Sequence, residues 1–86
     1  MAKETFSSDK ILKYLREVQR EYETGGIWLA RKLGRRWSYV CGLEPESFGQ
    51  PEIFLIYPDY ALFVENSEKF KLEVTKIIEN LKKLME

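Results

Sequence analysis

Few residues in this chain have side chains suited to catalysis or metal binding. Histidine, the commonest general base and metal ligand, is absent from the 86 residues. Cys41 is the single cysteine, so no disulfide can form within the chain, and we interpret Cys41 as a small buried apolar residue. Glu44 and Glu46 lie in a loop-forming stretch, where acid pairs are usually solvated. The sequence therefore predicts no enzyme activity, no catalytic residue, no metal site and no cofactor.

Positive charge is concentrated in the middle of the chain. The 14 basic and 14 acidic side chains give a formal net charge of zero. Residues 24–43 nevertheless contain four basic residues and no acidic one, whereas residues 44–86 contain five basic and nine acidic ones. A short basic segment is either a solvated surface or an anion-binding one. Its members are Arg31, Lys32, Arg35 and Arg36.

Two apolar stripes predict helices at the ends of the chain. After the capping residues Ser7-Ser8-Asp9, apolar residues recur at steps of three and four up to Tyr22, and Gly25-Gly26 ends the helix. A second stripe follows Asn66 or Ser67 with the 4-3-4-3 steps of a heptad. Its residues are Phe70, Val74, Ile77, Leu81 and Leu84. This stripe packs either on the chain's own core or partly on a second subunit.

Residues 52–64 predict a β-hairpin. Glu52–Tyr57 and Tyr60–Val64 are rich in β-branched and aromatic residues, and Pro58-Asp59 between them is a turn signal. Both runs are apolar on both faces, so at least one face is expected to be buried. Residues 43–51, with two prolines and a glycine, predict a loop.

Residues 27–43 fit either strands or two short helices. In the helical interpretation, residues 27–33 place Leu29, Ala30 and Leu33 on an inner face. Gly34 follows where a helix often ends in the left-handed conformation. A second helix over residues 36–43 turns Val40 and Leu43 inward.

The pattern Leu29-Ala30-x-x-Leu33-Gly34, followed by Val40 and Leu43, resembles the helix-turn-helix signature of DNA-binding regulators. With a helix before it and a hairpin after it, the chain resembles a winged helix-turn-helix protein. The resemblance implies one α+β domain over residues 1–86 with the order α-α-α-β-β-α. Its parts would be the helix-turn-helix at 26–43, a wing-like hairpin at 52–66 and a C-terminal helix at 67–85.

The resemblance implies a transcriptional regulator that binds double-stranded DNA in a sequence-specific manner. The helix over residues 36–43 would enter the major groove, and the C-terminal helix would form a homodimer. Two positions depart from the family pattern: Arg35 replaces a buried aliphatic residue, and Asp59 replaces a basic wing tip. The residues expected to contact DNA are Arg31, Lys32, Arg35, Arg36, Trp37, Ser38 and Tyr39.

The alternative is an α-β-β-β-β-α fold, an antiparallel sheet with two helices on one face. Gly34-Arg35-Arg36 would then be a hairpin turn, and the protein would be a protein-interaction or dimerisation module. Adjacent Arg31 and Lys32 favour the helical interpretation, because one of the pair would point inward from a strand.

Size and composition limit both interpretations to a single domain. The chain of 86 residues is 44% apolar and 14% aromatic, which is enough for one core and too little for two. The N-terminus lacks the apolar segment of a signal peptide, and no apolar run has the length of a membrane span. We therefore expect a cytoplasmic protein that does not insert into membranes.

Overall fold

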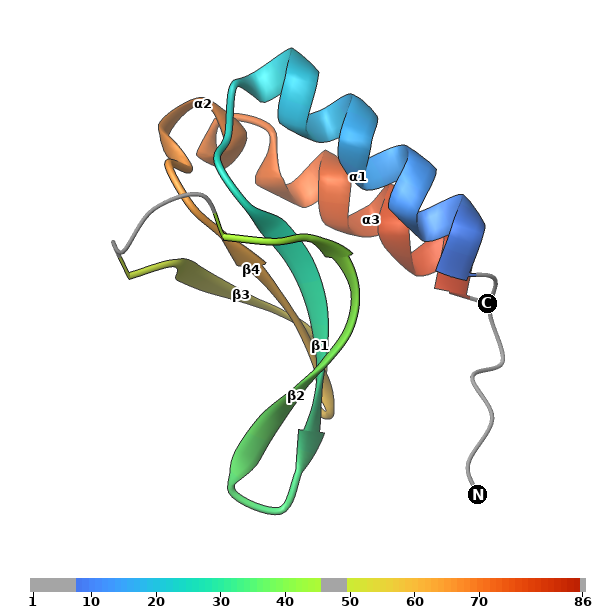
Figure 1. Cartoon of the computed structure of the whole chain (residues 1–86). Coiled ribbons are helices and arrows are strands. Elements are labelled where there is room, and N and C mark those ends of the chain that lie inside the picture. Colours follow the sequence, from blue (N-terminus) through green and yellow to red (C-terminus); the bar gives the residue numbers. More distant parts are fainter. Residues whose placement is uncertain (1–7, 46–49, 86) are drawn as a thin grey trace.

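A computed structural model describes residues 8–45 and 50–85 of the chain. The fold is α+β, with one four-stranded antiparallel sheet and three helices in this described part (Figure 1). The predicted capping residue Ser7 and the acidic residue Glu46 lie outside the described residues. The elements in chain order are α1 (Ser8–Tyr22), β1 (Ile27–Leu33), β2 (Arg36–Leu43), β3 (Glu52–Tyr57), β4 (Tyr60–Val64), α2 (Glu68–Lys71) and α3 (Val74–Met85).

The segment predicted as a helix-turn-helix is a β-hairpin, so the prediction of two helices at 26–43 is wrong. Strands β1 and β2 pair in antiparallel fashion, with Leu33 opposite Arg36. The two residues between them form a tight turn in which Gly34 has a φ of +63°. Glycine at the first turn position allows the twist of two-residue hairpins. Gly34 therefore marks a turn between two strands and not the end of a helix.

Pairing with β4 makes β1 a central strand. The sheet order is β2-β1-β4-β3, and β1 pairs with β4 from Ile27 opposite Val64 to Arg31 opposite Tyr60. The predicted hairpin of β3 and β4 is confirmed, but it forms half of the sheet and does not project as a wing. The order α-α-α-β-β-α is consequently wrong, and the four strands follow the order of the α-β-β-β-β-α alternative.

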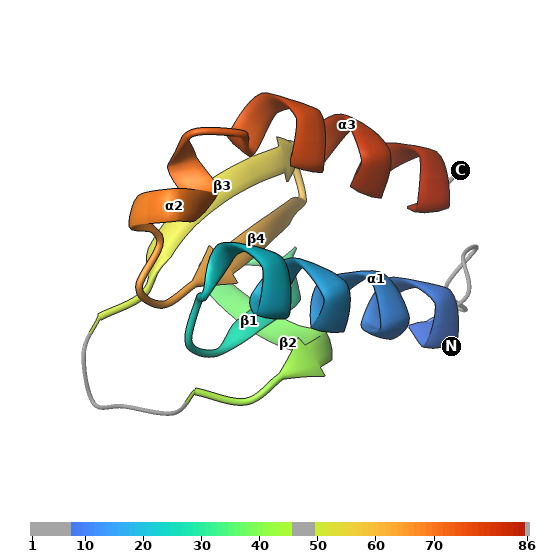
Figure 2. The ribbon, with the colours of Figure 1, turned by 90° about the horizontal axis from the view of Figure 1, so that it is seen from above.

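Helices α1 and α3 lie side by side on one face of the sheet (Figures 1 and 2). The predicted stripe of α1 enters the core between this helix layer and the sheet, and Ile11 and Leu15 are fully buried. Strands β1 and β4 contribute alternate residues to the same core. Those in the centre of the core are Ile27, Leu29, Leu62 and Val64.

The C-terminal segment 67–85 is two helices and not the single one predicted. Helix α2 ends at Lys71, and the amides of Leu72 and Glu73 bond back to Lys69 and Phe70, three residues earlier, before α3 begins. The heptad stripe packs within the chain, because Phe70, Ile77 and Leu81 are buried in the core. No helix in the described residues is long and apolar enough to span a lipid bilayer.

Candidate binding surfaces

The face of the sheet opposite the helices carries a continuous set of apolar side chains. Side chains alternate between the two faces of a strand. Trp28 and Ala30 of β1 therefore point to the face of the sheet away from the core, whereas Ile27 and Leu29 point into the core. The pairing registers extend this alternation to the other strands. We call the resulting surface the open sheet face. Its residues are Trp28, Ala30, Lys32, Trp37, Tyr39, Gly42, Ile53, Leu55, Ala61 and Phe63.

Three aromatic rings pack together at the centre of the open sheet face. The ring centroids of Trp28 and Phe63 are 5.5 Å apart with an interplanar angle of 17°. Trp37 meets Phe63 edge to face at 5.9 Å. Ala30 and Ala61 are paired on the same face, and both are buried although no helix covers them. Large neighbouring side chains therefore cover the alanines and give the face a packed centre.

Large apolar side chains surround this aromatic centre and remain in contact with water. Leu55 is 66% exposed and Ile53 49% exposed on β3, and Tyr39 is 51% exposed on β2. The Tyr39 hydroxyl donates a hydrogen bond to the carbonyl oxygen of Gly42 at 2.8 Å. Desolvation raises the pKa of the Tyr39 phenol, with smaller contributions from Cys41 and Glu44. Among the described residues, Lys32 is the one charged residue on the face, and it lies toward the end of the face.

The basic residues singled out in the sequence gather at the end of the β1–β2 hairpin. Arg31, Lys32, Arg35 and Arg36 form what we call the basic hairpin tip. Lys32, Arg35 and Arg36 are exposed, and Arg31 is half-buried. In Figure 1 this end of the hairpin extends away from the helix layer. The four cations are therefore close together, although no recognition helix carries them.

The three other residues predicted to contact DNA are separated by the strand geometry. Trp37 and Tyr39 lie on the open sheet face, whereas Ser38, opposite Arg31, projects toward the helix side. The seven predicted residues thus occupy one hairpin but do not form one contact surface. Ile53, Leu55 and Phe63 were missed as site residues. In the sequence, β3 and β4 are apolar on both faces. This pattern indicates that apolar side chains such as these lie on a face that the core does not bury.

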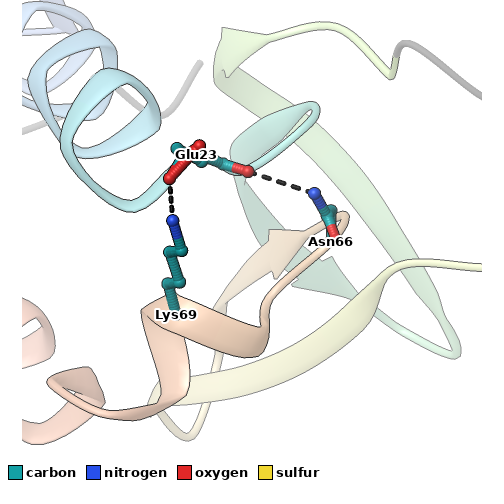
Figure 3. Close-up of polar contacts among 3 residues, drawn as sticks. All are labelled: Glu23, Asn66 and Lys69. Atoms are coloured by element: carbon teal, nitrogen blue, oxygen red, sulfur yellow. Dashed lines mark hydrogen bonds and ion pairs between the residues drawn. The ribbon is translucent and has the colours of Figure 1, made fainter.

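A polar junction joins the chain segments at the other end of the sheet (Figure 3). Glu23 forms an ion pair with Lys69, and its carbonyl oxygen accepts a hydrogen bond from Asn66 Nδ2 at 3.1 Å. Glu23 and Asn66 both have a φ of +53°. The ion pair is exposed, so its contribution to stability is small, and the junction serves to connect α1 with the start of α2.

A buried carboxylate lies beside this junction. Glu65 is 4% exposed, and its Oε1 accepts a hydrogen bond from the Gly26 amide at 2.8 Å. Backbone hydrogen bonds also join Glu65 to Gly25 and Gly26. These bonds connect the start of β1 to the end of β4, which gives Glu65 a structural task.

The other polar and thiol side chains considered from the sequence lie elsewhere among the described residues. No group of three or more acidic or cysteine side chains there could hold a metal ion. Cys41 is buried in the core, as the sequence predicted, and Glu44 is exposed. A hollow of about 190 Å³ between α1 and α3 is lined in part by Tyr14 and Asn80. There Asn80 Nδ2 donates to the Tyr14 hydroxyl at 3.2 Å, and burial raises the Tyr14 pKa.

Comparison with family models, with curated proteins and with solved structures found no match to this chain. The open sheet face and the basic hairpin tip are therefore the two surfaces of this chain that suggest a function.

Proposed function

We propose that this chain is a dimerisation module that pairs with a second copy of itself through the open sheet face. The observation that carries the proposal is the aromatic and aliphatic surface of that face, which no described element covers. Monomeric proteins rarely expose contiguous apolar patches larger than a few hundred Å², and larger patches mark interaction sites. The helix stripe first considered for dimerisation lies in the chain's own core, which leaves the sheet as the better surface.

The size of the face suits a small interface between two copies. Strands lie about 4.8 Å apart and rise about 3.3 Å per residue, so four strands of about five residues cover roughly 19 by 17 Å. Side chains on such an area expose more surface than its flat outline. Two copies together would bury on the order of 1,000 Å², below the roughly 1,200–2,000 Å² of stable interfaces and within the range of weak, transient ones.

The charge pattern favours a second copy as the occupant. In a two-fold dimer the same patch meets itself, so an apolar patch is its own complement. Lys32 is the single charged side chain on the open sheet face and lies toward its end, so two faces can meet without burying a charge at the centre. Two sheets packed face to face at about 10 Å would form a sandwich whose inner layer contains Trp28, Phe63 and Leu55.

Analytical ultracentrifugation over a concentration series tests the proposal. We expect the wild type to sediment with twice the chain mass of 10.2 kDa at high concentration and to dissociate on dilution, because the interface is small. Leu55→Asp should be monomeric, since it places a carboxylate in the apolar interface. Leu55→Met should remain dimeric.

Leu72→Asp is the matched control, because Leu72 is 82% exposed but lies at the α2–α3 break and not on the open sheet face. It should leave the dimer intact. Far-UV circular dichroism checks that each variant is folded. A wild type that is monomeric throughout the series, or equal dissociation by Leu72→Asp, would refute dimerisation through this face.

A further inference from the structure

We propose that the basic hairpin tip binds the phosphate backbone of duplex DNA as a two-stranded ribbon. The basic hairpin tip shares only Lys32 with the open sheet face, and the proposal does not depend on dimerisation. The sequence analysis expected these four cations in a helix-turn-helix. In the structure the β1–β2 hairpin carries them instead.

The tip carries four cations, and an acidic residue, Asp59, lies beside Lys32 and offsets part of this charge. None of its four cations forms an ion pair with another described residue, whereas Lys69 and Lys71 are paired with Glu23 and Glu52. The sequence from residue 24 to residue 43 contains no acidic side chain. A compact group of unpaired cations attracts polyanions, and each contact with a DNA phosphate releases counterions.

The shape of the tip fits a DNA groove. Strand β1 pairs with β4 only as far as Arg31, and the last bond between the two hairpins runs from the Lys32 amide to the Asp59 carbonyl oxygen at 2.7 Å. Beyond this point the hairpin continues as a short two-stranded tip, with Leu33 paired to Arg36 and Gly34 and Arg35 in the turn. The major groove of B-DNA, about 12 Å wide, admits a two-stranded ribbon.

The cations also project in several directions from the ribbon. Lys32 lies on the side of the open sheet face, Arg31 and Arg36 lie on the opposite side, and Arg35 lies in the turn. A groove is bordered by a phosphate backbone on each side. A ribbon with cations on both faces and at its end can therefore contact both backbones at once.

Fluorescence anisotropy with a short labelled duplex of mixed sequence tests the proposal from about 50 to about 200 mM salt. We expect the logarithm of the binding constant to fall linearly with the logarithm of the salt concentration. Four phosphate contacts per tip predict a slope of about −3.6. Arg35→Ala/Arg36→Ala should reduce the magnitude of this slope by about 1.8 per bound tip. Asp59→Asn should strengthen binding, because it removes a negative charge beside Lys32.

Lys76→Ala/Lys83→Ala is the matched control, since it removes two exposed cations of α3 and leaves the tip intact. It should keep the wild-type slope. Absence of binding at the lowest salt concentration, or equal loss in the control, would overturn the proposal. Tighter binding of the single strand, abolished by Trp37→Ala but not by the arginine double variant, would also overturn it. Sedimentation of the arginine variant as a dimer shows that a loss of DNA binding is independent of self-association.

Discussion

Gly42 lies directly opposite Trp28 in the β1–β2 ladder, and a Cβ added to Gly42 would come within 2.4 Å of the Trp28 Cα. Gly42 also has a φ of +144°, a conformation that other residues rarely adopt. Glycine is therefore required at this position for two separate reasons. The missing side chain allows β2 to keep its register beside a central aromatic residue of the open sheet face.

Gly42→Ala should destabilise the protein strongly. The backbone conformation alone costs an alanine about 1–3 kcal/mol, and overlap with Trp28 adds about 1–3 kcal/mol. Gly34→Ala is the control, because its φ is +63° but no atom lies within 4 Å of the added Cβ. It should cost only about 1–2 kcal/mol. Urea unfolding at one fixed protein concentration measures both, and equal losses would contradict the close approach.

The stacked pair of Trp28 and Phe63 should show a measurable coupling energy. Aromatic pairs of this geometry contribute about 0.5–1.5 kcal/mol beyond their buried area. A double-mutant cycle with Trp28→Leu and Phe63→Leu isolates this term. The cycle is best made in the Leu55→Asp background, where self-association is not expected to contribute. Strict additivity of the two substitutions would show that the rings do not interact energetically.

Glu65→Ala should cost about 1–3 kcal/mol of unfolding free energy, because it leaves the Gly26 amide without its side-chain acceptor. Glu65→Gln keeps an acceptor oxygen and should cost less. Glu79→Ala, at an exposed position of α3, serves as the control and should have little effect. Chemical denaturation compares the three variants. A glutamine variant as unstable as the alanine variant would argue that the carboxylate acts other than through this bond.

Glu52 provides a pH-dependent prediction. A hydrogen bond from Lys71 lowers the pKa of its carboxyl group, and a second bond from the Ser67 hydroxyl at 2.8 Å lowers it further. A lowered pKa in the folded state means that the carboxylate stabilises the fold above its unfolded pKa. This stabilisation is lost as the pH falls through the folded pKa.

Lys71→Met should therefore raise the Glu52 pKa toward its ordinary value and weaken the loss of stability in acid. Carbon-13 NMR titration of the side-chain carboxyl measures the pKa directly. Lys76→Met removes an equal charge from α3 and should leave the titration of Glu52 unchanged. Equal shifts in the two variants would assign the effect to net charge and not to the contact.

Much of the outer framework was predictable from local patterns. The spacing of Ile11, Leu15 and Val18 predicted α1 and its buried side. The Pro58-Asp59 turn between two β-rich runs predicted the β3–β4 hairpin. The heptad stripe predicted which residues of the C-terminal segment are apolar contacts, although the break after Lys71 was not visible in it. Each of these patterns is produced by neighbours within a few residues, so a sequence window contains the information.

The adjacent cations Arg31 and Lys32 were misinterpreted for a physical reason. Their adjacency favours a helix over a strand on the assumption that one of the pair would point inward from a strand. Strand β1 extends beyond the part of the sheet that the helices cover, and its other face is open, so Lys32 is exposed and Arg31 only half-buried. Two adjacent charged residues are disfavoured in a strand only where at least one of its faces is buried at that position.

The sequence by itself determined the amphipathic helices, the second hairpin and the position of the basic cluster, because each depends on local spacing or composition. Only the tertiary structure decided that residues 27–43 are strands. Their apolar and aromatic residues suit a short helix or a strand, and the turn glycine suits both. The difference lies in hydrogen-bond partners: Ile27–Arg31 pairs with residues 60–64, more than 25 positions later in the chain. That distant pairing gives β1 a central place in the sheet, and it creates the open sheet face and the projecting basic tip.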